Sequence, residues 1–281
     1  MASVRHAAVM ATIVATGRGR TWRSAGALDA AIRTRAPWPA TPPRSGHGVA
    51  VSARDADGLR LVSLVPPRSR GTVVAIHGGG TVFGPERQHW DLWRRIAAAS
   101  GRTVVAVLHP LAPQGTAAEV VPAVARAAAV AEGPVALLGD SAGGGIALAA
   151  ALLLRERGLT PTLLLSAPWL DLTMHAPWRM ERDPWLAVPG LRRAADLWRS
   201  DLPADHPLVS PLLADLDGLG PIVAASGTRD VLHRDALRLQ QRVPLGSPFE
   251  LLVGEGLLHN YPLLPVPEAR GAVLAFARAL R

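Results

Sequence analysis

The sequence predicts an α/β fold built on a mostly parallel sheet with helices on both faces. The chain has 281 residues, 49% of them hydrophobic, which provides enough apolar surface for a sizeable core. Short apolar, β-branched runs recur at residues 72–77, 103–109, 134–140, 160–168, 221–227 and 249–256. Helix-like segments lie between most of these runs, at residues 86–100, 115–132, 142–157, 231–243 and 267–280. Buried runs that alternate with helices in this way are typical of a parallel sheet covered on both faces.

Two stretches that do not follow this alternation predict a small cap. Residues 1–45 precede the regular part, and residues 169–215 form a proline- and tryptophan-rich insertion between two expected strands. Ligands of α/β sheets bind at the carboxyl edge of the strands, where this insertion would emerge. We therefore expect one main domain over residues 46–281, with a cap made of the N-terminal segment and the insertion.

Composition excludes several classes of protein. The absence of cysteine excludes disulfides, cysteine metal sites and thiol nucleophiles. The net charge is +8, but the basic residues are all arginine and are scattered rather than clustered, so we expect no nucleic-acid partner. A metal or cofactor is not expected either, and a homodimer remains open.

The N-terminus bears on localisation. No apolar stretch reaches the length of a membrane span. Residues 5–17 resemble a short signal region, but no clear cleavage site follows them, so we expect an amphipathic helix that lies on the domain. A cytoplasmic protein is the expectation, with secretion or membrane association as the alternatives.

The segment Gly139-Asp140-Ser141-Ala142-Gly143 has the form G-x-S-x-G, between an expected strand and an expected helix. Glycine on both sides of Ser141 removes Cβ clashes on a sharp turn and leaves the serine oxygen exposed at the start of the helix. This arrangement is typical of a strained serine nucleophile. The alternative is an ordinary glycine-rich turn between a strand and a helix.

A second motif, His77-Gly78-Gly79-Gly80, ends the expected strand 72–76. Attack of a serine on an acyl group creates an oxyanion, and a glycine loop can direct bare backbone amides at it. We expect the amides of Gly78, Gly79 and Ala142 to be the donors, and His77 to anchor the loop rather than transfer protons. The alternative is a flexible glycine turn, which would explain neither the histidine nor its position in the chain.

These motifs resemble the hormone-sensitive-lipase-like branch of the α/β-hydrolase fold, the bacterial esterases with an HGGG loop and a GDSAGG elbow. The resemblance covers roughly residues 59–280 and includes "HGGGTVFG", "GDSAGG", "SAPWLDLT" and "HNYPLLP". It implies a carboxylic ester hydrolase without a cofactor that acts on short to medium acyl chains. The family block Asp-Tyr-Arg-Leu-Ala-Pro-Glu differs here, where residues 108–114 read Leu-His-Pro-Leu-Ala-Pro-Gln.

The fold predicts the partners of the serine, because the acid and then the histidine follow it in the chain. Asp230 directly follows the expected strand 221–226, and His259 follows the expected strand 249–253, so both lie at the sheet edge of Ser141. The alternatives are a helix N-cap for Asp230 and a surface role for His259. Glu255 is the competing acid, and His233 is badly placed as a base because it lies only three residues after Asp230.

Tryptophans in the two cap segments are candidates for an apolar substrate pocket. Those of the insertion are Trp169, Trp178, Trp185 and Trp198, and those near the N-terminus are Trp22 and Trp38. The alternative is that they form the core of the cap itself.

We therefore expect a serine carboxylesterase that acts on a small-molecule ester through an acyl-enzyme. Two alternatives remain open. One is a non-catalytic, receptor-like binding protein on the same scaffold, against which His259 argues. The other is an amidase or peptidase with the same triad, since a fold does not determine the leaving group.

Overall fold

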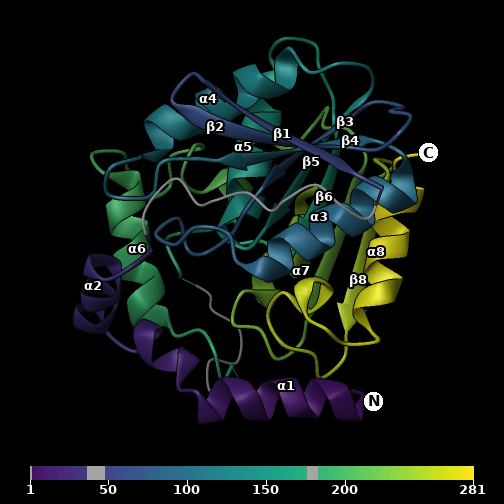
Figure 1. Cartoon of the computed structure of the whole chain (residues 1–281). Helices are drawn as coiled ribbons and strands as arrows, with labels where there is room; N and C mark the ends of the chain where they lie inside the picture. The colour runs from purple at the N-terminus through teal and green to yellow at the C-terminus, as the bar shows by residue number, and fades with distance from the viewer. Residues whose placement is uncertain (1, 37–47, 176–182) are drawn as a thin grey trace.

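The computed structural model describes residues 2–36, 48–175 and 183–281, and an eight-stranded sheet forms its centre (Figure 1). The strand order is β1-β2-β4-β3-β5-β6-β7-β8. The strands are β1 Ala50–Ala56, β2 Leu59–Val65, β3 Thr72–Ile76, β4 Thr103–Leu108, β5 Val135–Asp140, β6 Thr162–Ser166, β7 Ile222–Gly227 and β8 Phe249–Gly254. Strands β3 to β8 pair in parallel, whereas β1 with β2 and β2 with β4 pair antiparallel. The expected α/β fold with a mostly parallel sheet is confirmed.

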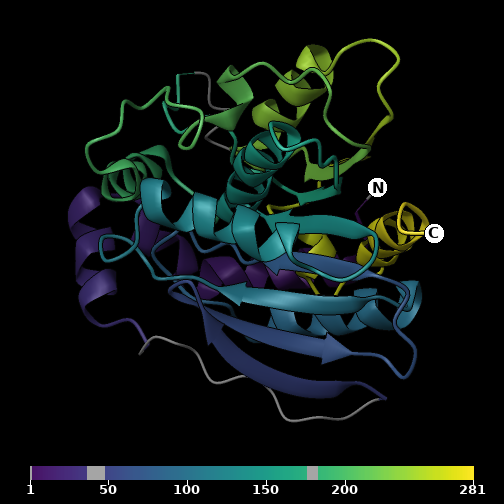
Figure 2. The same ribbon diagram turned by 90° about the horizontal axis from the view of Figure 1, so that it is seen from above.

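The hairpin β1–β2 was not expected from the sequence. Its turn is Asp57-Gly58, with φ of 52° and 74°, which matches the positive φ angles of a tight two-residue hairpin turn. β1 is largely exposed and carries Arg54 and Asp55, so it lacks the apolar run that marks the buried strands. In Figure 2 this hairpin lies at the outer edge of the sheet.

Helices cover both faces of the sheet, as the alternation predicts. The main-domain helices are α3 Arg87–Ser100, α4 Ala117–Ala129, α5 Ala142–Arg155, α7 His233–Arg242 and α8 Ala269–Arg278. Successive residues of β3 face opposite cores: Val73 and Ala75 pack with α3 and α8, whereas Val74 and Ile76 pack with α4 and α5. Two apolar layers therefore hold the sheet rigidly beneath the loops at its carboxyl edge.

The two expected cap segments lie against each other beside this edge (Figure 1). Their elements are α1 Val4–Ala15, η1 Arg18–Trp22, α2 Ala25–Arg33 and α6 Val188–Arg199. A Cβ on Gly19 would lie 2.5 Å from the carbonyl oxygen of Pro184, and a Cβ on Gly190 would lie 2.5 Å from that of Trp22. Glycine at these two positions therefore lets the backbones of the two segments pack directly against each other.

Helix α1 covers the amphipathic stretch expected at residues 5–17 and docks on the main domain. His6 is buried and its Nε2 accepts a hydrogen bond from the amide of Leu258 at 3.0 Å. Ser3 caps the helix and also donates to Glu268. Among the helices of the described residues, none has the length and apolar character needed to cross a bilayer. The remaining short helices are η3 Pro211–Leu213 and η4 Tyr261–Leu263.

Candidate active site

Ser141 occupies the turn between β5 and α5 in a strained conformation. Its φ is 51° and its ψ is −122°, a region that residues with a Cβ rarely adopt. A Cβ on Gly139 would collide with the carbonyl oxygen of Gly143, and one on Gly143 would collide with that of Ile76. Glycine at both flanking positions is therefore a steric requirement of this turn. The side chain of Ser141 lines a cavity.

Asp230 and His259 form a buried pair at the ends of β7 and β8. Their side chains meet at 2.8 Å between Asp230 Oδ2 and His259 Nδ1, and the other Asp230 oxygen accepts the amide of Leu232 at 2.8 Å. Because the carboxylate accepts from Nδ1, the neutral imidazole leaves Nε2 as a base. His259 lines the same cavity as Ser141.

Electrostatics around His259 favour its protonated form. Burial alone would lower the pKa of its imidazole, but the neighbouring carboxylates, Asp230 first among them, together outweigh burial. Asp183 and Asp140 add further negative charge, and the pKa of His259 is raised above its ordinary value. The site is thus arranged to accept a proton at the histidine.

The two competing residues lie elsewhere. Glu255 is exposed, and its carboxylate is 3.4 Å from the hydroxyl of Thr228. His233 is buried at the start of α7, with its Nδ1 3.0 Å from the hydroxyl of Ser226. Neither residue lines the cavity that contains Ser141.

The glycine loop after β3 differs in one respect from the expectation. The amide of Gly78 donates to Asp140 Oδ1 at 3.2 Å, so it is already engaged. Gly79 and Gly80 line the cavity with φ of 89° and 60°. Within the described part of the chain, the amides of Gly79, Gly80 and Ala142 donate no hydrogen bond. The amide of the expected donor Gly78 is therefore already bound, whereas Gly80, which the sequence analysis did not name, lines the cavity.

Asp140 is buried and accepts hydrogen bonds from several elements. The sequence showed only that it precedes Ser141 and did not indicate this role. Besides Gly78, Asp140 receives hydrogen bonds from His89 Nε2 at 3.2 Å and Asn260 Nδ2 at 2.9 Å. His89 Nδ1 accepts the amide of Glu86, so Nε2 carries the proton. Burial would lower the pKa of His89, but Asp140 raises it. Asp140 thus ties the glycine loop, α3 and the loop after β8 to the residue next to Ser141.

Two stacked imidazoles lie next to the glycine loop, and one of them contacts its main chain. The rings of His77 and His109 lie 4.4 Å apart at 9°, and each Nδ1 is 2.9 Å from a carbonyl oxygen, that of Gly78 and that of Pro110. Because a carbonyl only accepts, both Nδ1 atoms carry protons. Burial lowers the pKa of both imidazoles, which favours their neutral form. His109 belongs to the block that departs from the family pattern, and it places a second imidazole on the residue expected to anchor the loop.

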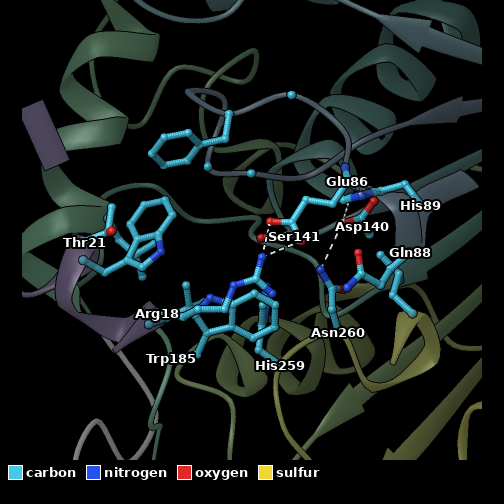
Figure 3. Close-up of a pocket in the computed structure, with 18 of the residues that line it drawn as sticks. Arg18, Thr21, Glu86, Gln88, His89, Asp140, Ser141, Trp185, His259 and Asn260 are labelled. Atoms are coloured by element: carbon cyan, nitrogen blue, oxygen red, sulfur yellow. Dashed lines mark hydrogen bonds and ion pairs between the residues drawn. The ribbon is translucent and has the colours of Figure 1, made fainter. Parts of the chain in front are cut away.

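The cavity lies between the sheet edge and the cap and has a volume of about 280 Å³ (Figure 3). Trp22 and Trp185 line it, together with Phe83, Leu186 and Leu191 among others. The walls thus combine these apolar side chains with polar groups that include Ser141, His259 and Asn260.

Two further cap tryptophans of the described residues, Trp169 and Trp198, do not line this cavity. Trp169 is completely buried, with its indole nitrogen 3.1 Å from the sulfur of Met174. Trp198 is buried on α6, with its ring 5.9 Å from that of His109. Both therefore serve as core, the alternative considered for them. Trp38 and Trp178 lie outside the described residues.

Two of the residues that line the cavity, Arg18 and Glu86, form an ion pair. The guanidinium of Arg18, on η1, contacts both oxygens of Glu86 at 2.6 Å and lies 5.6 Å from the ring centroid of Trp185 (Figure 3). Trp185 in turn packs edge-on against His259, with ring centroids 5.8 Å apart. The N-terminal segment and the insertion thus both contribute to the walls around His259.

Comparison with known proteins identifies the family. A sequence model described as the alpha/beta hydrolase fold matches residues 73–263. The chain is 33% identical over 233 residues to an acetyl-hydrolase of Streptomyces hygroscopicus, covering 77% of each protein. The chain belongs to the α/β hydrolase fold family. A second relative of this α/β hydrolase is a triacylglycerol lipase of Mycobacterium tuberculosis, 34% identical over 218 residues, which cover 74% of this chain and 46% of the lipase.

Solved structures agree with this assignment to the α/β hydrolases. A hormone-sensitive lipase from a metagenome library is 25% identical, with a TM-score of 0.74, over 85% of this chain and 87% of that one. An esterase of Pyrobaculum calidifontis is 26% identical, with a TM-score of 0.72, over 83% and 84%. The resemblance to the hormone-sensitive-lipase-like branch is confirmed.

Proposed function

We propose that this α/β hydrolase is a serine carboxylesterase. His259 Nε2 removes the proton of Ser141 as its oxygen attacks the ester carbonyl, and then donates that proton to the leaving alcohol. Water, deprotonated by the same imidazole, releases the acyl group from Ser141. Asp230 orients His259 and stabilises its imidazolium. The observation that carries the proposal is the buried Asp230–His259 pair, whose imidazole lines one cavity with the strained Ser141.

The oxyanion donors in this proposal are the amides of Gly79, Gly80 and Ala142. All three are without an acceptor in the described chain, and glycine at the first two positions keeps side chains away from the developing charge. Ala142 is the first residue of α5, so the helix N-terminus adds a favourable dipole. Gly78 instead holds Asp140, which keeps the loop close to the serine turn.

Short to medium acyl esters are the proposed substrates. The relatives named acetyl-hydrolase and esterase support an ester, and the cavity of about 280 Å³ between Trp22 and Trp185 is suited to a small apolar acyl group. The cap that encloses it is proposed to comprise residues 1–45 and 169–215, with the catalytic domain over residues 46–281. In this scheme the cap selects the substrate, and the three reacting side chains, Ser141, Asp230 and His259, belong to the catalytic domain.

A series of p-nitrophenyl esters from acetyl to dodecanoyl, with p-nitroanilides of the same acids, tests the function. We expect hydrolysis that is fastest for short to medium esters, an initial burst of p-nitrophenol where deacylation is slow, and little cleavage of the anilides. Faster turnover of the anilides would indicate an amidase. Binding of esters without turnover would indicate the receptor-like alternative, and either result would contradict the proposal.

A further inference from the structure

Asp183 lies where the cap insertion meets the loop that follows β7. Its Oδ2 accepts the amide of Val231 at 2.9 Å, and its Oδ1 accepts the amides of Trp185 at 2.8 Å and Leu186 at 2.9 Å. All three partners are main-chain donors. This carboxylate therefore fixes backbone on both sides of the boundary between cap and catalytic domain.

The first segment that Asp183 holds is the one that carries Asp230. Val231 directly follows Asp230, and the next amide, that of Leu232, is held by Asp230 itself at 2.8 Å. Two consecutive amides are thus bound by two different carboxylates. Since this leaves the loop little freedom to rotate, the remaining oxygen of Asp230 stays directed at His259.

The second segment that Asp183 holds carries the indole that packs on His259. The amide of Trp185 is bound to Asp183, and its ring lies at 82° to the imidazole with centroids 5.8 Å apart. Figure 3 shows Trp185 beside His259 at the cavity. One carboxylate from the cap therefore supports both the acid and a packing partner of the base.

Charge adds to these contacts. Burial and the neighbouring charge of Asp230 raise the pKa of Asp183 to about 6, and the charge of His259 lowers it. Asp183 is consequently ionised at neutral pH, where it raises the pKa of His259. The interaction is reciprocal, because each group stabilises the charged form of the other.

We propose that Asp183 is a positioning residue of the Asp230–His259 pair, supplied by the cap: its carboxylate fixes the backbone after Asp230 and the indole on His259, and its negative charge stabilises the imidazolium formed during acyl transfer. This proposal rests on the proposed function, in which His259 is the base. In this proposal the insertion contributes to catalysis in addition to lining the cavity.

Other charged groups lie near His259 and Asp183. Asp140, at the end of β5, also raises the pKa of His259, and it is itself bound to His89 on α3. Arg23 and Arg229 line a groove beside Asp183 under α1. The test therefore has to isolate the charge of Asp183 from these neighbours, which substitution by the amide does.

The Asp183→Asn variant should lower kcat at pH 8 about ten-fold, because one charge-assisted hydrogen bond to the loop is lost and the imidazolium is less stable. The acid limb of its kcat/KM profile should move to lower pH, since His259 loses one anionic neighbour. A readout that does not need turnover is the imidazole titration of His259, followed by NMR with labelled histidine. It should give a lower pKa in the variant than in the wild type.

Asp235→Asn is the matched control. Asp235 is also a buried carboxylate that accepts two amides, those of Leu170 and Asp171, but it is not among the charges that act on His259. We expect its His259 titration to match the wild type. An unchanged His259 titration in Asp183→Asn, or an equal shift in both variants, would overturn the proposal. Asp183→Ser replaces Asp183→Asn if the latter does not fold, and the same outcomes decide.

Failure of the proposed function is distinguishable from failure of this inference. If Ser141→Ala retained turnover, the esterase mechanism would be wrong, whereas the NMR titration would still report whether Asp183 acts on His259. If Ser141→Ala were inactive and the titration unchanged, only the role of Asp183 would be rejected.

Discussion

At the scale of the residue, the stacked imidazoles of His77 and His109 make the free energy of unfolding depend on pH. Both imidazoles are fully buried, and burial lowers the pKa of each, that of His109 to about 4 and that of His77 well below its ordinary value. In the unfolded chain both titrate near 6.5. As pH falls below 6.5 the unfolded chain binds protons that the folded protein does not, so the free energy of unfolding decreases until the folded pKa is reached.

Replacing His109 by Phe keeps a flat ring on His77 and removes one of these titrations. We expect the free energy of unfolding to fall less between pH 7.5 and pH 5 in His109→Phe than in the wild type, by about 2 kcal/mol. Urea unfolding at the two pH values measures the difference. His175 is exposed, so His175→Gln should follow the wild type. An equal decrease in His109→Phe and the wild type would show that the stacked imidazoles do not titrate as described.

At the scale of the element, the cap and the glycine loop meet at Trp22. Its indole lies against Gly80, where a Cβ would collide with the ring, and 6.0 Å from the ring of Phe83. Its backbone is in turn pressed on Gly190 of α6. A small displacement of α6 would therefore move Trp22, and with it one wall of the cavity.

Gly190→Ala should displace these two cap segments, because its Cβ would lie within 2.5 Å of the backbone of Trp22. We expect KM to increase for hexanoyl and octanoyl esters, which need the full cavity, and to change much less for the acetyl ester. Gly26→Ala on α2 is the matched control, since a Cβ there meets nothing within 4 Å. A folded Gly190→Ala variant with an unchanged acyl-length profile would mean that the cap does not select the substrate.

At the scale of the whole molecule, the sheet brings distant residues together. Ser141, Asp230 and His259 follow β5, β7 and β8, and the glycine loop follows β3, all at one edge. Parallel pairing made this convergence predictable from the order of the motifs, as did the small residues around Ser141. The sequence could therefore indicate the fold and the main candidates of the site.

What the sequence could not indicate depends on contacts made only in the folded chain. Whether Trp169 or Trp185 faces the cavity is decided by the path of the insertion, which local patterns do not encode. The engagement of Gly78 by Asp140 and the amides held by Asp183 are likewise tertiary contacts. The hairpin β1–β2 was missed for a local reason, because an exposed edge strand lacks an apolar run, although its Asp57-Gly58 turn was a readable signal.

Labelling with a serine-reactive alkyl phosphonate, followed by mass analysis of the peptides, is the direct test of Ser141 as the nucleophile. We expect one adduct, on Ser141, with loss of esterase activity in proportion to labelling. Ser141→Ala should remain folded, take up no label and lose on the order of 10⁶ in kcat, whereas Ser69→Ala, at a surface position, should behave like the wild type. An adduct on another residue, or a Ser141→Ala variant that keeps more than a few per cent of the activity, would show that Ser141 is not the nucleophile.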